Sequence, residues 1–215
     1  MGMSERGFFL TIEGIDGVGK STQARMLAQR LRTLGREVVE TREPGGAPGA
    51  EEIRRLLVGG NPERWSPETE MLLFTAARRD HVERVIQPAL ARGNVVLCDR
   101  FVDSTRAYQG TGAPERRTLV DQLHRLAIGL NPDLTLIFDM DPVVALERAR
   151  SRESNIDEDR FEKMGQNFQA RLRAEFLAIA AAEPARCALI DATLPTEAVA
   201  AQVWAAVAPR LGLAL

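Results

Sequence analysis

Short, mostly apolar runs alternate with longer stretches of helical periodicity along the chain. The apolar runs are 8–13 (FFLTIE), 36–41 (REVVET), 94–99 (NVVLCD), 134–139 (LTLIFD) and 187–191 (CALID). Helical patterns occupy 20–34, 50–58, 67–91, 115–128, 142–150, 159–182 and 196–211, with a bend expected near Pro88. Strands that are apolar throughout indicate a parallel sheet covered on both faces. The pattern therefore predicts a three-layer α/β fold with a five-stranded parallel sheet flanked by helices.

Length and composition narrow the class of protein. The 215 residues show no internal repeat or linker, so we predict one domain over 1–215. A net charge of −2 without a basic block argues against nucleic acid as a partner. No apolar run approaches the roughly 20 residues of a membrane helix, and MGMSERG has no apolar core of a secretory signal. The two distant cysteines, Cys98 and Cys187, build no disulfide framework, and we expect a reducing cytoplasm.

The stretch GIDGVGKST carries the first candidate chemistry. Its spacing satisfies G-x-x-x-x-G-K-[ST], and it follows a predicted strand and opens a predicted helix. Backbone N–H groups of such a loop bind phosphates, its lysine reaches the outer phosphates, and its hydroxyl ligates Mg²⁺. Lysine occurs in the chain only twice, and one of the two is at this position. We predict that ATP is bound by Gly14, Ile15, Asp16, Gly17, Val18, Gly19, Lys20, Ser21 and Thr22, with Ser21 on the metal.

A second polar group follows the strand 94–99. Asp99 and Arg100 stand at its carboxyl end, where ligands of parallel sheets bind. Asp99 could hold Mg²⁺ or its waters, and Arg100 could clamp a phosphate. A plain salt bridge at the surface is the alternative reading of this pair.

A third region is rich in arginine. In ERARSRESNIDEDRFE, Arg148, Arg150 and Arg152 recur at every second position, and Arg160 follows a polar stretch. Guanidinium groups stabilise the charge of a moving phosphoryl group, and a mobile lid keeps water out. We therefore predict a short lid at about 150–160, although alternating Arg and Glu is also usual on an exposed helix.

Four further segments carry a family resemblance. TREPGG (41–46), LLFTAAR (72–78), DRFVDSTRAYQG (99–110) and NPDLTLIFD (131–139) follow the glycine loop in order. This set resembles the bacterial thymidylate kinases, over about 8–192. The resemblance implies transfer of the γ-phosphoryl group of ATP to dTMP, with Mg²⁺, in dTTP synthesis. No guanine-selecting N-K-x-D occurs, so a GTPase is not indicated.

The resemblance also assigns roles to individual residues. It implies that Phe74 stacks on thymine, that Arg78 donates to its carbonyl edge, and that Tyr108 crowds the 2′ position of the sugar. Asp16 would accept from the 3′-OH, and Glu43 would lie near the acceptor and the metal. The implied dTMP-binding set is Asp16, Glu43, Phe74, Arg78, Arg100, Ser104, Tyr108 and Gln109.

The resemblance completes the catalytic set. In this family an arginine of the phosphate loop can serve in place of lid arginines. The loop positions here are Asp16, Gly17 and Val18, so the resemblance implies that the lid provides the catalytic arginine. The predicted catalytic residues are Lys20, Arg100, Arg150 and Arg152, with Arg148 on ATP; which lid arginine touches the moving group stays open. The chain departs from the family at Phe101, where Tyr or His is frequent, and by SNIDE in the lid.

Several readings remain open beside the kinase of dTMP. They are a kinase of another nucleoside or nucleoside monophosphate and a nucleotide-binding switch without transferase activity. No carboxylate pattern accompanies His81 or His124, and we interpret both as structural. The resemblance also implies a homodimer joined through helices.

Overall fold

A single parallel sheet lies at the centre of the computed structural model, which describes residues 6–59, 64–150 and 165–214, without the side chains of 149 and 150. Its strands are β1 (Phe9–Glu13), β2 (Val38–Arg42), β3 (Val95–Asp99), β4 (Leu134–Asp139) and β5 (Cys187–Asp191). Their order is β2-β3-β1-β4-β5, and every pairing is parallel. The predicted α/β fold with five parallel strands is therefore confirmed.

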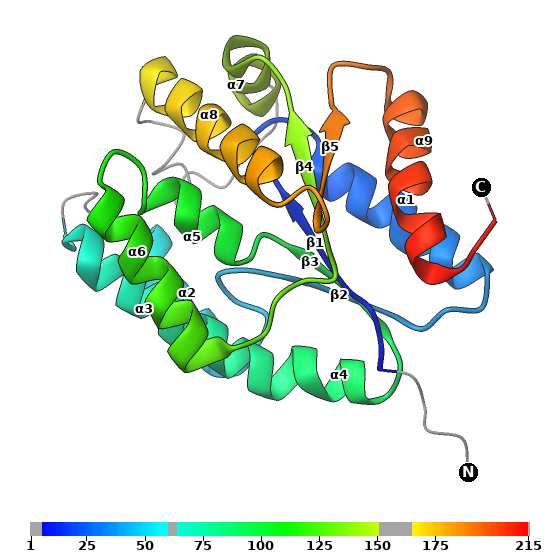
Figure 1. Cartoon of the computed structure of the whole chain (residues 1–215), viewed down its shortest axis with the longest axis horizontal. Coiled ribbons are helices and arrows are strands. Elements are labelled where there is room, and N and C mark those ends of the chain that lie inside the picture. Colours follow the sequence, from blue (N-terminus) through cyan, green and yellow to red (C-terminus); the bar gives the residue numbers. More distant parts are fainter. Residues whose placement is uncertain (1–5, 60–63, 151–164, 215) are drawn as a thin grey trace.

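Helices cover both faces of the sheet (Figure 1). On one face α1 (Lys20–Thr33) packs beside α9 (Thr196–Val207), which continues into a 3-10 turn, η5 (Ala208–Leu211). On the other face lie α4 (Gln87–Ala91), α5 (Val102–Tyr108) and α8 (Gln166–Ala182), and α7 (Pro142–Arg150) packs on α8. An outer group comprises α2 (Pro48–Val58), α3 (Pro67–His81) and α6 (Pro114–Leu123).

The central strand β1 explains how the two faces are held. All five of its residues are buried, as expected for the middle of a parallel sheet. Leu10 and Ile12 join a core with Leu27 of α1 and Val203 of α9. Phe9, which points to the opposite face, joins a second core with neighbours from β3 and α4. The edge of the sheet at which β1 ends is thus fixed from both sides.

Three helical details differ from the sequence prediction. The stretch 67–91 is divided by a π-helical turn, η1 (Val82–Ile86), just before Pro88. Proline lacks the N–H of a regular helix, so the backbone widens there instead of keeping the α-helical ladder. A similar turn, η2 (His124–Ile128), ends the helix begun by α6. The short helix α5 was not predicted, because its motif gives no apolar periodicity.

Within the described parts of the chain, no helix combines the length and apolar character needed to span a bilayer.

Candidate functional site

The glycine loop joins β1 to α1 at the carboxyl edge of the sheet. Gly14 has φ 134°, and a Cβ atom there would lie 2.6 Å from the carbonyl oxygen of Phe138, so only glycine fits. Gly19, at φ 94°, is the N-cap of α1 and supplies no side-chain cap to the first turn. The N–H of Thr22 donates to the Gly19 carbonyl at 3.1 Å, whereas the N–H groups before it have no acceptor within the helix and can bind an anion such as phosphate.

Lys20 lies folded across this loop. Its Nζ donates to the carbonyl oxygens of Gly14 at 3.1 Å and Ile15 at 2.8 Å, and lies 3.6 Å from Asp16. Burial, with the nearby positive charge of Arg100, lowers the pKa of Lys20. An ammonium held by two neutral carbonyls can exchange them for anionic phosphate oxygens, which bind it more strongly.

The residues that were predicted to hold a metal lie together. Ser21 Oγ donates to Asp99 Oδ2 at 3.1 Å, and Asp99 Oδ1 is buried without a hydrogen-bond partner among the described residues. A buried, unpaired carboxylate oxygen next to a hydroxyl suits a hard cation such as Mg²⁺. The described residues contain no group of three or more His, Cys, Asp or Glu suited to a metal. These two side chains thus fit a metal that takes its other ligands from water and substrate.

Arg100 crosses from the end of β3 to the glycine loop. Its backbone adopts φ 69°, the one left-handed non-glycine residue in the described ranges. Its guanidinium donates to Asp16 Oδ1 at 2.5 Å, to the Gly14 carbonyl at 3.2 Å and to Ser104 Oγ at 3.0 Å. A residue other than glycine is strained in this left-handed conformation, and such strain concentrates at functional sites. Arg100 is partly buried and bonded to three groups, more than a plain surface salt bridge requires.

The charges around Asp16 keep it ionised. Burial alone would raise its pKa, but Arg100 and Lys20 together lower the pKa of Asp16 to about 2. Tyr108 donates to its second oxygen at 3.4 Å, and burial raises the pKa of the Tyr108 hydroxyl. Asp16 and Tyr108, which were predicted at the sugar, thus lie side by side between the loop and α5.

Another polar group, separate from Asp99 and Arg100, lies deeper in the protein, between α3 and the segment after β2. Arg78 Nε donates to Glu43 Oε2 at 2.7 Å, and Nη2 donates to Thr105 Oγ1 at 3.0 Å. His81 Nδ1 lies 3.1 Å from the other oxygen of Glu43. Our reading of His81 as lacking a carboxylate partner is therefore wrong, because a residue 38 positions away in the chain provides it.

The remaining predicted side chains of the acceptor site have more varied places. Phe74 is half-buried on α3, and Gln109 is buried and donates to Glu70 at 3.3 Å. Ser104 lies by Arg100 and the glycine loop. The structure thus gathers Asp16, Arg100, Ser104 and Tyr108 at one position, and Glu43 with Arg78 at another.

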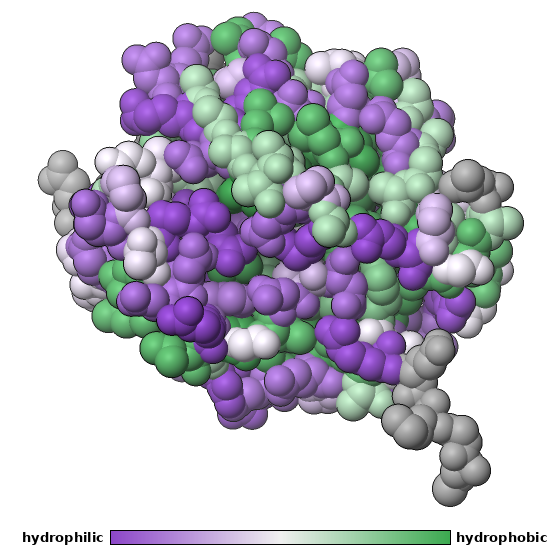
Figure 2. All heavy atoms as spheres, viewed as in Figure 1, coloured by the Kyte–Doolittle hydropathy of each residue, from purple (hydrophilic) through white to green (hydrophobic). Residues whose placement is uncertain are grey.

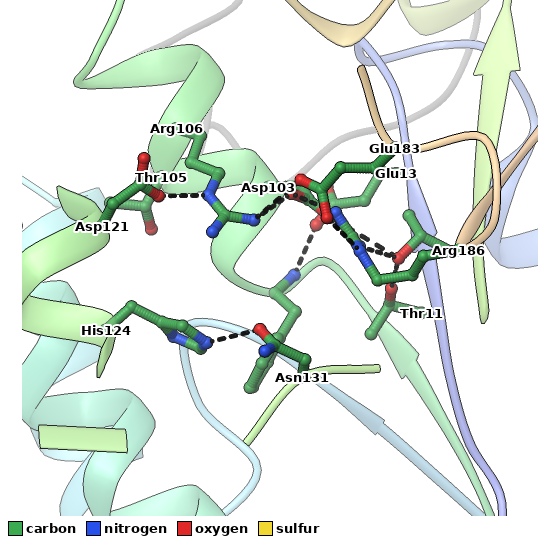
Figure 3. Close-up of polar contacts among 12 residues, drawn as sticks. Thr11, Glu13, Asp103, Thr105, Arg106, Asp121, His124, Asn131, Glu183 and Arg186 are labelled. Carbon is green, nitrogen blue, oxygen red and sulfur yellow. Dashed lines mark hydrogen bonds and ion pairs between the residues drawn. The ribbon is translucent and has the colours of Figure 1, made fainter. Parts of the chain in front are cut away.

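Sequence reasoning missed two buried acids next to this site. Glu13, the last residue of β1, accepts hydrogen bonds from α5, and Asp103 of α5 binds Arg106 at 2.8 Å and Arg186 at 2.6 Å (Figure 3). Burial would raise the pKa of Asp103, but the two arginines, Arg186 foremost, lower it overall. The signal for Glu13 was present: like Asp99, it is an acid at the carboxyl end of a buried strand.

The arginine region is described only at its start. Arg148 donates to the carbonyl oxygen of Ala192, directly after β5, at 3.2 Å. The side chain of Arg150, the whole of Arg152 and Arg160, and most of the predicted lid lie outside the described residues. Their roles stay predictions.

A phosphate-binding loop at the carboxyl edge of a parallel sheet, opposed by an arginine and a second set of polar groups, defines a nucleotide kinase of the phosphate-loop class. Comparison with known proteins narrows this class. The family model described as thymidylate kinase matches residues 12–203. The chain belongs to the thymidylate kinase family, and it is therefore an enzyme and a transferase.

Individual relatives agree with this assignment. The thymidylate kinase of Dinoroseobacter shibae is 61% identical over 203 residues, covering 94% of this chain and 97% of the relative. That of Ruegeria pomeroyi is 60% identical over 201 residues, covering 94% of each. The crystal structure of thymidylate kinase from Ehrlichia chaffeensis superposes with a TM-score of 0.74 at 36% identity, covering 94% of this chain and 99% of that one.

Proposed function

We propose that the chain transfers the γ-phosphoryl group of ATP to dTMP, giving ADP and dTDP. The observation that carries the proposal is the position of Arg100, bonded across the glycine loop to Asp16 in a left-handed conformation. It sets a phosphate-binding guanidinium beside a phosphate-binding loop. Two anionic groups can therefore meet end to end, as transfer between two nucleotides requires.

The glycine loop binds the donor in this proposal. Its N–H groups and the start of α1 receive the phosphates, and Lys20 moves from the carbonyls of Gly14 and Ile15 to the outer phosphate oxygens. Arg148, next to the turn after β5, would contact ATP. Arg150 and Arg152 remain our candidates for the guanidinium that follows the moving charge.

Ser21 and Asp99 would hold Mg²⁺. When bound, the ion neutralises charge on the phosphate oxygens. The hydrogen bond between these two side chains and the unpaired Asp99 Oδ1 support this assignment.

The acceptor lies on the other side of the loop. Arg100 clamps its phosphate, Asp16 accepts from the 3′-OH, and Tyr108 fills the space beside C2′, so that deoxyribose is favoured. Phe74 stacks on the base, while Arg78, Ser104 and Gln109 provide its polar contacts and Glu43 holds Arg78. An ionised phosphate oxygen is already a nucleophile, so the reaction needs no general base; positioning and charge stabilisation suffice.

A survey of acceptors tests the proposal. Turnover with ATP is measured for dTMP, dUMP, dCMP, dGMP, AMP and thymidine, and we expect dTMP to have the highest kcat/KM. Preference for thymidine over dTMP would show that Arg100 does not serve an acceptor phosphate. ATP hydrolysis that is indifferent to all six acceptors would favour the nucleotide-binding switch.

A homodimer is part of the proposal. Large apolar side chains are exposed on three adjoining elements: Leu56 of α2 is 38% exposed, Leu72 of α3 56%, and Leu126 of η2 81%. Apolar residues also gather over the side of the molecule where α2 and α3 lie (Figure 2). Sedimentation of the wild-type protein and of Leu72→Glu tests this face. We expect the wild-type protein to be a dimer and Leu72→Glu to be a monomer, and a monomeric wild-type protein would contradict the proposed homodimer.

A further inference from the structure

The helix α5, which carries Ser104 and Tyr108, has no cap of its own. Its N-cap residue is Phe101, whose side chain makes no hydrogen bond to the first turn. The first N–H groups of a helix have no partner within the helix, so a buried helix start needs one from elsewhere.

Glu13 of β1 provides that partner. Its Oε1 accepts from the backbone N–H of Phe101 at 2.7 Å and of Ser104 at 3.1 Å, and its Oε2 accepts from Ser104 Oγ at 2.6 Å. In a local capping box, an acid at the third helical position accepts from the N-cap N–H. Here a carboxylate 88 residues away does so, and it also bonds the third position itself.

These hydrogen bonds are made by residues that lie directly next to Arg100. Phe101, whose N–H is bound to Glu13, directly follows the left-handed Arg100, and Ser104 Oγ accepts from the Arg100 guanidinium at 3.0 Å. A left-handed residue other than glycine persists only when its surroundings fix it. Glu13 fixes the backbone after the arginine and the hydroxyl beneath its side chain.

We propose that Glu13 is a positioning residue for binding of the acceptor phosphate. By capping α5, Glu13 holds Arg100 in its binding conformation. This inference rests on the proposed role of Arg100 in binding that phosphate. Glu13 is fully buried, and its hydrogen bonds within the described parts of the chain go to Phe101 and Ser104 rather than to Lys20 or Ser21 on the donor side. Its removal therefore acts first on the phosphate end of the acceptor, and it reaches the donor side only through the loss of a negative charge near Lys20.

Thymidine separates this role from a general loss of structure, since it lacks the phosphate but keeps the base and sugar. Calorimetric titration with dTMP and with thymidine compares the wild-type protein with Glu13→Ala and Glu13→Gln. Because Glu13→Ala removes the three hydrogen bonds that hold the backbone and the hydroxyl next to Arg100, we expect it to bind dTMP at least about tenfold more weakly. The affinity for thymidine, which does not use Arg100, should fall by a clearly smaller factor than that for dTMP, and the KM for ATP should change less than about threefold.

The glutamine variant tests the geometry. Its amide oxygen can still accept from both backbone N–H groups, and its NH₂ can donate to Ser104 Oγ. We expect its dTMP affinity within about threefold of the wild type, which is rescue by the conservative side chain. A glutamine variant as weak as the alanine variant would overturn the capping argument.

Asp133→Ala is the matched control. Asp133 Oδ2 accepts from the backbone N–H of Phe9 at 2.7 Å, at the opposite end of the same strand. This variant loses a comparable long-range bond far from the site, so its dTMP affinity should be unchanged. Equal losses in Glu13→Ala and Asp133→Ala would mean general destabilisation and overturn the inference.

Arg100→Ala separates this inference from the function on which it rests. Normal dTMP binding by Arg100→Ala would overturn the role of Arg100 itself. Weak binding by Arg100→Ala with normal binding by Glu13→Ala would overturn only the role of Glu13. If Glu13→Ala does not fold, Glu13→Asp replaces it, because its carboxylate is one methylene too short to reach all three donors; unchanged dTMP affinity there also refutes the inference.

Discussion

Replacing Arg78 by methionine should destabilise the fold as well as weaken dTMP binding. The side chains of Arg78 and Glu43 are only 3% and 4% exposed, and Arg78 Nε lies 2.7 Å from Glu43 Oε2. Methionine keeps the apolar stem but leaves the Glu43 carboxylate buried without its arginine. Breaking a buried pair on one side costs about 3–5 kcal/mol.

The surroundings place the cost at the lower end of that range. Glu43 keeps its contact with His81 at 3.1 Å, while Thr105 loses a donor. We therefore expect a loss of about 3 kcal/mol in the free energy of unfolding. For a chain of 215 residues this lowers Tm by about 6–12 °C.

Urea denaturation of three variants measures this cost. Arg78→Met alone should lower the midpoint without changing the slope m. Adding Glu43→Gln removes the unpaired charge and should restore at least about half of the loss. Arg79→Met, next along α3, breaks a pair whose side chains are about half exposed and should cost at most about 1 kcal/mol.

Two results would refute the reasoning. One is an Arg78→Met protein as stable as Arg79→Met, and the other is a double variant no more stable than Arg78→Met alone. Binding is measured well below the lowered Tm, where dTMP affinity should fall and ATP affinity should not. Equal losses for both nucleotides would argue against base recognition by Arg78.

Three further predictions concern the donor side and pH. Lys20→Ala should abolish transfer yet keep dTMP affinity in calorimetry, and normal turnover would refute the loop assignment. Asp99→Asn should raise the Mg²⁺ concentration needed for half-maximal turnover by about tenfold or more, and an unchanged magnesium titration would remove Asp99 from the metal site. Burial, with the neighbouring Asp103, raises the pKa of Glu13 from 4.5 to about 7. Between pH 4.5 and pH 7 the folded protein then binds more protons than the unfolded chain. The stabilisation of the folded state by protonated Glu13 is therefore complete below pH 4.5 and is lost as pH rises through 7. The stability of the wild-type protein relative to Glu13→Gln should fall by about 2–3 kcal/mol from pH 5 to pH 8, and a constant difference would contradict the shift.

Local signals along the chain specify much of this site. An apolar strand, a glycine loop with its lysine, and an amphipathic helix follow one another without a break, so each could be read from its own residues. The same holds for Asp99 and Arg100, because the end of a buried parallel strand marks the ligand edge of such a sheet. The short α5 escaped prediction because its residues show no apolar periodicity and its cap comes from Glu13 of β1, which is distant in the sequence.

The sequence alone determined the five strands, the phosphate-binding loop and the residues from which a second nucleotide site could be built. Only the tertiary structure decided the strand order, which sets β3 beside β1 and so brings Arg100 to Asp16 across 84 positions of the chain. It also decided which charges are buried together, such as Arg78 with Glu43 and His81, and Glu13 with the start of α5. Periodicity and motifs report on neighbours along the chain, whereas the pKa values and the conformation of a left-handed arginine depend on neighbours in space.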